Sequence, residues 1–291
     1  MFSLEKRNAL IHLMRLDRPY GTLLLLFPTL WSLVIAASGR PTLTHLMVFI
    51  LGSFFMRSAG CVINDMTDYK FDAQVARTKD RPIASGVLTH KEAFFVLIPL
   101  LTVSFLLVLL LNTRTILFSF IALFVASFYP FAKRLTHFPQ AVLGIAFSFG
   151  ILMAWTAVLN EITLIPILIF IANLFWTIGY DTIYALMDKE DDLKIGVKST
   201  AIFFGSKSTI AIGFCFLNVV LLLYLVGQQA KMGAPYYEAL MIAAIGLLYQ
   251  TVLLLSAFRS GRSAERERLF SLFKAHVFIG AIILAGIVFN Y

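Results

Sequence analysis

The chain has 291 residues, of which 59% are hydrophobic and only 14% are charged, and its mean hydropathy is +0.86. Soluble domains are roughly half apolar, so this composition excludes an ordinary soluble domain and indicates an integral membrane protein. The net charge of +8 accompanies long apolar stretches, so membrane topology explains it better than binding to nucleic acid does.

The chain begins with a charged, amphipathic segment, MFSLEKRNALIHLMRLDRPYG. This segment lacks the short apolar core and the small-residue cleavage site of a secretory signal, so we expect it to be retained. The two cysteines, Cys61 and Cys215, lie in apolar segments and have no metal-like spacing. A structural disulfide or a zinc site is therefore not expected.

Apolar segments of about 20 residues, long enough to cross a bilayer as helices, recur along the chain with short polar breaks. They predict an all-α fold, a polytopic membrane helix bundle of about nine transmembrane helices that forms one domain over residues 1–291. The expected spans are 21–38, 43–64, 92–112, 114–131, 139–158, 162–186, 208–228, 236–257 and 270–289. The third and fourth spans are separated only by NTR, which predicts a tight antiparallel hairpin.

The basic residues of the connecting segments indicate the orientation of the bundle. If the N-terminus is cytoplasmic, every Lys and Arg falls on the cytoplasmic side except Arg40, Arg114 and Lys231, together with Arg57 inside the second span. Lys and Arg accumulate in cytoplasmic loops. The asymmetry therefore predicts that the polar site of this multi-pass membrane protein faces the cytoplasm.

Acidic residues gather in two loops that this topology puts on the same face. One group follows the second span and the other follows the sixth: Asp65, Asp68, Asp72 and Asp80, and then Asp181, Asp188, Glu190, Asp191 and Asp192. Two cytoplasmic Asp-rich loops are therefore expected to face each other across the mouth of the bundle.

The spacing of these residues places oxygen ligands in rows, because helix residues three or four apart lie above one another. We call the two rows the first stripe (Asn64, Asp68 and Asp72) and the second stripe (Asp181, Tyr184, Asp188 and Asp192). Oxygen ligands supplied by two helices, with room for water and phosphate, suit Mg²⁺ bound with a phosphorylated substrate. Merely hydrophilic loop ends would explain one acidic cluster more easily than two.

Basic residues are interleaved with these acids. AQVARTKDRP follows Asp72, LKIGVKST follows the second stripe, and YPFAKR adds Lys133 and Arg134. Acids and bases would neutralise one another unless a ligand bridges them, and a diphosphate held by Mg²⁺ and by Arg and Lys is such a bridge. Inner loops are basic in any membrane protein, so a purely topological role stays open for each single cation.

Both stripes resemble motifs of a known family. NDMTDYKFD, followed by RTKDRP, is similar to the first Asp-rich motif of the UbiA superfamily of intramembrane aromatic prenyltransferases, and DTIYALMDKEDDLKIGVKST is similar to the second. The resemblance covers the whole chain, including RLDRPYG before the first span and YPFAKR after the fourth. Within the superfamily, YALMDKEDDLKIGVKSTA and RPYGTLLLLFPTLW are most similar to the 4-hydroxybenzoate polyprenyltransferases of ubiquinone biosynthesis.

The resemblance implies transfer of a polyprenyl group from polyprenyl diphosphate to the ring carbon ortho to the hydroxyl of 4-hydroxybenzoate, with release of diphosphate. The implied partners are these two substrates and membrane lipid, without nucleic acid. Two Mg²⁺ ions would stabilise the charge on the leaving diphosphate, one held by the first stripe and the other by Asp188 with Asp192. The resemblance also implies that Arg77, Lys133 and Lys198 contact phosphate oxygens.

The expected site combines these residues with others that lie deeper. We expect catalytic roles for Asp68, Asp72, Asp188, Asp192, Asp181 and Lys133, and substrate binding by Arg18, Arg57, Asn64, Arg77, Tyr184 and Lys198. Arg57 lies seven residues before Asn64, about two helical turns, so it should face the same cavity. An arginine at membrane depth is costly and marks function.

Two deep residues keep alternative roles. Arg57 either binds the carboxylate of the acceptor, together with Arg18, or forms a structural ion pair. Asp181 either orients Lys133 or accepts the ring proton.

Other functions also stay open at this point. The same chemistry could act on another aromatic acceptor. A cation-coupled transporter also buries Asp and Arg, although it would place them near the middle of the membrane beside broken helices. A structural membrane subunit would need neither stripe.

Overall fold

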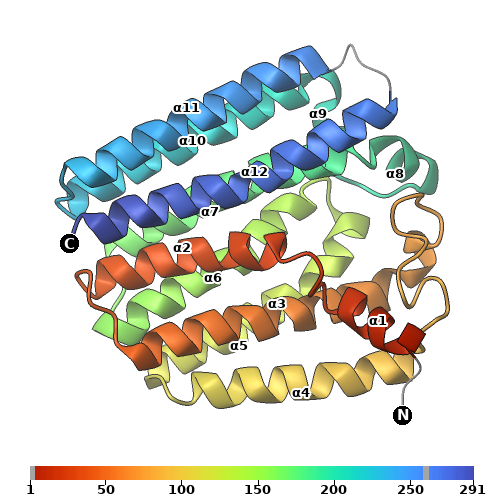
Figure 1. Cartoon of the computed structure of the whole chain (residues 1–291), viewed down its shortest axis with the longest axis horizontal. Helices are drawn as coiled ribbons and strands as arrows, with labels where there is room; N and C mark the ends of the chain where they lie inside the picture. Colours follow the sequence, from red (N-terminus) through yellow and green to blue (C-terminus); the bar gives the residue numbers. More distant parts are fainter. Residues whose placement is uncertain (1–3, 258–261) are drawn as a thin grey trace.

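The computed structural model describes residues 4–257 and 262–291. Its long helices run side by side, and the connections between them gather at two opposite ends (Figure 1). The elements in chain order are α1 (Leu4–Leu13), α2 (Tyr20–Ala36), α3 (Leu43–Asp72), α4 (His90–Val108), α5 (Thr113–Leu135), α6 (Pro139–Leu159), α7 (Leu164–Leu186), α8 (Lys189–Ile195), α9 (Thr200–Phe204), a 3-10 turn (Gly205–Lys207), α10 (Ser208–Gln229), α11 (Ala234–Ala257) and α12 (Arg262–Phe289).

Each of the nine predicted spans coincides with an apolar helix, from α2 for the first span to α12 for the ninth. Eight helices in the described ranges are long and apolar enough to cross a membrane, and α2 is a shorter apolar helix. The prediction of an all-α, multi-pass membrane bundle is confirmed. The short connection between α4 and α5 also forms the expected hairpin, in which Asn112 caps α5 by accepting a hydrogen bond from the Thr115 amide.

One end of the bundle carries the polar segments. It consists of α1, residues 73–89, residues 136–138 and residues 187–199, and we call it the basic end (Figure 1). Arg40 and Lys231 lie in connections at the opposite end, which agrees with the expected charge asymmetry. Two parts of the earlier expectations lie outside the described residues: positions 1–3 of the N-terminal segment and positions 258–261 of a predicted cytoplasmic connection.

The largest apolar core joins α2, α7 and α12. Trp31 and Trp176 stack with ring centroids 5.3 Å apart, and the indole nitrogen of Trp31 donates to the Gly280 carbonyl at 3.1 Å. A Cβ atom at Gly280 would lie 2.7 Å from Phe27 and 3.0 Å from Trp176, so glycine permits this close packing. The core fixes one wall of the bundle beside the polar site.

A second apolar cluster holds α1 against α3 and α4 at the basic end of the bundle. Leu13 of α1 is fully buried, and the cluster also contains Val62 of α3 and Ala93 of α4. An ion pair of 2.5 Å between Lys6 and Glu92 adds a polar contact between α1 and α4. The amphipathic N-terminal segment is therefore a packed part of the bundle, and it brings the α1–α2 connection to the polar site.

Candidate active site

A cavity of about 160 Å³ at the basic end brings the two predicted stripes together. It is lined by residues of α3, α5, α7 and the polar connections, including Asn64, Asp72, Arg77, Arg81, Tyr129, Lys133, Asp181, Tyr184, Asp188, Asp192 and Lys198. These residues come from positions up to 134 apart in the sequence, from Asn64 to Lys198. The expectation that the two acidic clusters face each other is therefore confirmed.

The first stripe lies on one uninterrupted helix, because α3 continues without a break to Asp72. Asp68 is fully buried, and its carboxylate pairs with Lys133 at 2.5 Å and with Arg134 at 3.4 Å. Asp72 pairs with Arg81 at 2.8 Å. Asn64 and Asp72 line the small cavity. Asp68 lines neither cavity and pairs with Lys133, which does line the small one.

The second stripe does not lie on one helix, which corrects the sequence-based interpretation. Helix α7 ends at Leu186, and α8 starts at Lys189. Asp188 is the N-cap residue of α8, and Asp192 lies in its first turn. Acids are favoured at the N-terminus of a helix, so the break places Asp188 and Asp192 where the helix dipole stabilises them. All four residues of the stripe nevertheless line the small cavity.

Arg77 connects the two stripes. Its Nη2 atom lies 2.6 Å from Oδ2 of Asp188, its Nε atom donates to the same carboxylate, and its Nη1 atom donates to the Tyr184 hydroxyl at 2.7 Å. Burial by itself would lower the pKa of Arg77, but Tyr184 and Asp188 raise it above its ordinary value. Arg77 therefore stays charged in the site.

Asp192 has a different electrostatic environment. Burial and the neighbouring Asp188 carboxylate raise the pKa of Asp192 to about 7, although Lys133 and Arg77 oppose the shift. This carboxyl group is thus partly protonated near neutral pH when no metal is bound. Lys198 lies close by, since its backbone amide donates to the Lys133 carbonyl at 3.0 Å.

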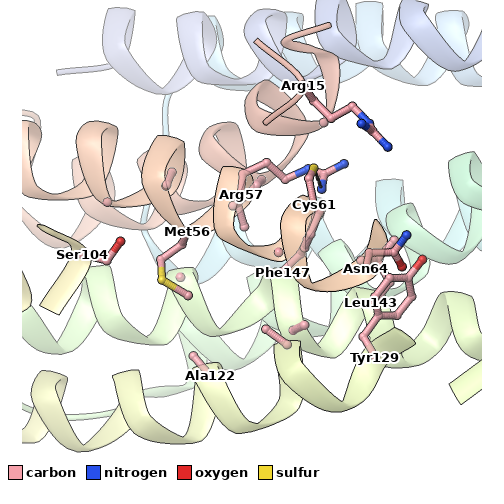
Figure 2. Close-up of a pocket in the computed structure, with 18 of the residues that line it drawn as sticks. Arg15, Met56, Arg57, Cys61, Asn64, Ser104, Ala122, Tyr129, Leu143 and Phe147 are labelled. Atoms are coloured by element: carbon pink, nitrogen blue, oxygen red, sulfur yellow. Dashed lines mark hydrogen bonds between the residues drawn. The ribbon is translucent and has the colours of Figure 1, made fainter. Parts of the chain in front are cut away.

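A larger cavity of about 800 Å³ lies next to the small one and extends into the bundle. Asn64, Tyr129 and Asp181 line both cavities, and Figure 2 shows Asn64 and Tyr129 on facing helices, with Met56, Ser104 and Ala122 farther along the same cavity. Its deep walls are mainly aliphatic and aromatic. A polar head at the basic end and an apolar tail along the bundle can therefore occupy adjoining spaces.

Arg57 lines this larger cavity, as the sequence predicts (Figure 2). It donates to Cys61 at 2.7 Å and lies over the ring of Phe147 at 5.9 Å. Its guanidinium lies against Gly21 of α2, where an added Cβ would come within 2.7 Å of two of its nitrogens. In the described part of the chain no carboxylate forms an ion pair with Arg57, and its buried Nε has no hydrogen-bond partner. The alternative of a structural ion pair is not supported.

The structure agrees less well with the roles predicted for Arg18 and Asp181. Arg18 lines the mouth of the larger cavity, but its side chain is 62% exposed and pairs with the adjacent Asp17 at 3.2 Å. Asp181 lines both cavities, whereas Lys133 is paired with Asp68, so the structure does not support the idea that Asp181 orients Lys133. Acceptance of the ring proton by Asp181 stays a prediction.

Three residues without a predicted role, Arg81, Asp65 and Arg15, also lie at the site. Arg81 pairs with both Asp72 and Asp65, and Arg15 of the α1–α2 connection pairs with Asp65. Arg81 lies in the RTKDRP segment, where the alternation of basic and acidic residues could have indicated its role. Arg15 and Asp65 are 50 residues apart, and no spacing pattern links them.

The site has the donor chemistry that Mg²⁺ prefers, but the carboxylates are paired with cations. No group of three or more His, Cys, Asp or Glu residues in the described ranges is close enough to hold a metal ion by itself. Mg²⁺ keeps several waters and is bound by one or two carboxylates together with substrate phosphates. Asn64, Asp72, Asp188 and Asp192 around one small cavity fit this mode of binding.

Comparison with known sequences places these features in a family. The sequence profile of the UbiA prenyltransferase family matches residues 25–286. The 4-hydroxybenzoate octaprenyltransferase of Vibrio campbellii is 47% identical to this chain and covers 99% of both chains. The enzyme of the same name from Aeromonas hydrophila is 47% identical over 99% of this chain and 98% of its own length.

Solved structures show the same fold. A UbiA homologue from Aeropyrum pernix in its apo form has a TM-score of 0.79, with 24% identity over 91% of this chain and 97% of that one. A UbiA homologue from Archaeoglobus fulgidus, bound to GPP and Mg²⁺, has a TM-score of 0.65, with 17% identity over 94% of this chain and 99% of that one.

Proposed function

The chain belongs to the UbiA prenyltransferase family, and we propose that it transfers a polyprenyl group from polyprenyl diphosphate to 4-hydroxybenzoate. The new carbon–carbon bond forms at the ring carbon ortho to the hydroxyl. The allylic carbon–oxygen bond breaks, diphosphate leaves, and the ring carbon loses its proton. This is the prenylation step of ubiquinone biosynthesis, and the protein is a multi-pass membrane enzyme.

One observation carries this proposal: a small cavity lined by carboxylates and cations adjoins a larger, mainly apolar cavity, and the larger cavity contains an arginine that forms no ion pair with a carboxylate of the described residues. The first space suits a metal-bound diphosphate, the second suits a prenyl chain and an aromatic ring, and the arginine suits a carboxylate. A cation-coupled transporter explains the buried charges but gives no reason for this combination.

Substrate binding requires the ion pairs of the site to exchange partners. Arg77 holds Asp188, and Lys133 holds Asp68. When a diphosphate enters, Arg77, Lys133 and Lys198 turn to its oxygens, and the carboxylates are released for metal. Charged groups that are already dehydrated and oriented stabilise a leaving anion more strongly than water does. Tyr184 keeps Arg77 in place through its hydroxyl, at 2.7 Å.

Mg²⁺ would neutralise the charge that grows on the diphosphate as the allylic bond breaks. The residues that would hold it are Asn64, Asp68 and Asp72 on one side and Asp188 with Asp192 on the other. Two opposite walls support the proposal of two ions.

The acceptor would bind deeper in the large cavity. Arg57 offers a guanidinium without a carboxylate partner, so it can hold the carboxylate of 4-hydroxybenzoate in a charge-assisted contact. Arg18 at the cavity mouth would assist as the acceptor enters. Asp181 lies between the two cavities and is our proposed acceptor of the ring proton. The apolar walls keep water away from the allylic cation.

The basic end faces the cytoplasm of the bacterial inner membrane in this proposal, because Lys and Arg are concentrated there. Both substrates would then reach the site from the cytoplasmic side, the prenyl diphosphate by way of membrane lipid.

The decisive experiment incubates membranes containing the protein with labelled prenyl diphosphate, Mg²⁺ and 4-hydroxybenzoate. Prenylated 4-hydroxybenzoate should form, and EDTA or an Asp188→Asn substitution should abolish it. Formation of a product only with a different aromatic acid would reject 4-hydroxybenzoate as the acceptor. The absence of prenyl transfer to any acceptor would reject the proposed function.

A further inference from the structure

A chain of four charged residues links the N-terminal segment to the first stripe. Nη2 of Arg15 donates to both oxygens of Asp65, at 2.8 and 3.0 Å. Nη1 of Arg81 lies 3.2 Å from Oδ1 of Asp65 and 2.8 Å from Oδ2 of Asp72. The order of contacts is therefore Arg15, Asp65, Arg81, Asp72.

The geometry makes one nitrogen serve two carboxylates. Nη1 of Arg81 donates a hydrogen bond to Asp72 and also lies within ion-pair distance of Asp65. A guanidinium nitrogen whose attraction is divided in this way binds each carboxylate less strongly than if it faced only one. The Asp65 side chain is only 1% exposed, so solvent does not weaken its attraction for Arg81.

Asp65 is itself held in place by the N-terminal segment. Arg15 has a φ of 57°, in the left-handed region that a non-glycine residue rarely adopts, and a side-chain contact to the His12 carbonyl accompanies this turn. The buried Leu13 anchors α1 just before the turn. Arg15 and Asp65 both line the large cavity, and the packing of α1 thus fixes the position of Arg15 and, through it, that of Asp65.

We propose that Asp65 is a positioning residue that acts through Arg81: it draws Arg81 partly away from Asp72 and so keeps the Asp72 carboxylate available to a divalent cation. The inference rests on the proposed function, because it assigns Asp72 to the metal. It gives a reason for the burial of Asp65, which lines the large cavity but not the small one and is not a member of the first stripe.

The test measures binding of Mn²⁺, as a substitute for Mg²⁺, to the purified full-length protein in the presence of saturating inorganic diphosphate, by electron paramagnetic resonance. Asp65→Asn should weaken Mn²⁺ binding by roughly tenfold, since a hydrogen bond to a charged group contributes on that order to an equilibrium. Arg81 then has Asp72 as its main carboxylate partner and competes fully with the metal.

Arg15→Gln should not weaken Mn²⁺ binding, in contrast to Asp65→Asn. It leaves Asp65 with its full attraction for Arg81, which moves farther from Asp72, so Mn²⁺ should bind as tightly as in the wild type or more tightly. If Asp65 and Arg15 only fastened α1 to α3, both substitutions would loosen the same contact and weaken binding alike. Weakened Mn²⁺ binding by Arg15→Gln would therefore overturn the proposal, even if Asp65→Asn failed to fold.

An Arg81→Gln background separates the two ways in which Asp65 could act. If Asp65 works through Arg81, adding Asp65→Asn to Arg81→Gln should cause no further change in Mn²⁺ affinity. A further tenfold loss would show direct attraction of the metal by Asp65 and would overturn the proposal. Lys6→Gln, which removes the ion pair between α1 and Glu92 of α4, is the matched control and should bind Mn²⁺ as the wild type does.

These outcomes also separate the inference from the proposed function. A wild-type protein that binds no Mn²⁺ with diphosphate would reject the metal site, and the positioning role with it. A wild type that binds Mn²⁺ while Asp65→Asn binds it equally well would reject the positioning role alone.

Discussion

The two walls of the small cavity are built in different ways. The first stripe lies on an unbroken helix of 30 residues, and its acids are buried and paired with cations from other segments. The second stripe crosses the break between α7 and α8, and α8 has seven residues, none of them buried. Segments with few buried contacts open and shift at low cost in free energy. One wall is therefore fixed by packing, and the other can adjust to the ligand.

The largest expected effect comes from removing one acid from each wall. Asp68→Ala and Asp188→Ala should each lower turnover by about 10² to 10³, the loss seen when a preorganised electrostatic partner of a transition state is removed. The double mutant should be little worse than the poorer single mutant, because both walls act on one leaving group. Steady-state rates in membranes measure this.

If the losses of the two single mutants multiply in the double mutant, the two walls act independently, and the idea that both act on one leaving group is wrong. Protein level in the membrane is the control for folding, and it should be unchanged because neither acid is needed to cross the bilayer.

A smaller effect is expected for Arg57, which lies about two turns below the first stripe. Arg57→Ala should raise the KM for 4-hydroxybenzoate by roughly 10- to 100-fold, the order expected when a charge-assisted contact is lost. The KM for the prenyl diphosphate should change little. Equal changes in both KM values would assign Arg57 a general structural role.

The pH dependence of metal binding tests the adjustable wall. The pKa of Asp192 is raised to about 7 in the metal-free protein, so a metal must displace a proton from this group at lower pH. The apparent Mg²⁺ affinity should rise as the pH increases through 7, and should be roughly tenfold weaker at pH 6 than at pH 8. Asp192→Asn should flatten the profile in a Mg²⁺ titration, and an unchanged profile would assign the titration to another group.

Stiffness of the adjustable wall can be altered at the end of α8. Gly196 has a φ of 74° and caps this helix in the left-handed region, where another residue costs about 1 kcal/mol or more. Gly196→Ala should lower kcat/KM by roughly fivefold, which is the factor that corresponds to about 1 kcal/mol. Gly246→Ala, in a helix where the new Cβ would make only ordinary contacts at 3.9 Å, is the control.

The last prediction concerns the orientation of the protein in the membrane. Lys79 follows the first stripe and Lys194 follows the second, and both side chains are exposed. Single cysteines at these two positions, in a background without Cys61 and Cys215, should react with an impermeant thiol reagent only from the cytoplasmic side. Labelling from the outer side would reverse the proposed orientation.

Most of the fold could be predicted from the sequence because the bilayer fixes the length of each apolar segment. The predicted span 139–158, for example, corresponds to α6, Pro139–Leu159. The first stripe was also predictable, since helical spacing continued past the apolar part of α3. The break after Leu186 was not, because offsets of three and four give the same pattern whether or not the helix is interrupted.

The ion pairs between residues far apart in the sequence could not be predicted either. The spacing of Asp65 and Asp68 gives no sign that one pairs with Arg15 and the other with Lys133. Such contacts depend on how the helices pack, and the local pattern carries no information about packing partners. Arg57 was the exception, because a cation within an apolar span indicates a role without any knowledge of its neighbours.

The length of α2 has a consequence for the membrane around the enzyme. Its 17 residues extend about 25 Å, less than the roughly 30 Å of a typical hydrocarbon core. A short span is matched by local thinning of the bilayer. Tyr20 and Gly21, at the basic end of α2, line the large cavity, so the headgroup layer sinks toward the cavity mouth at this helix. An amphiphile anchored in that layer can deliver its charged head to the site while its tail stays in lipid.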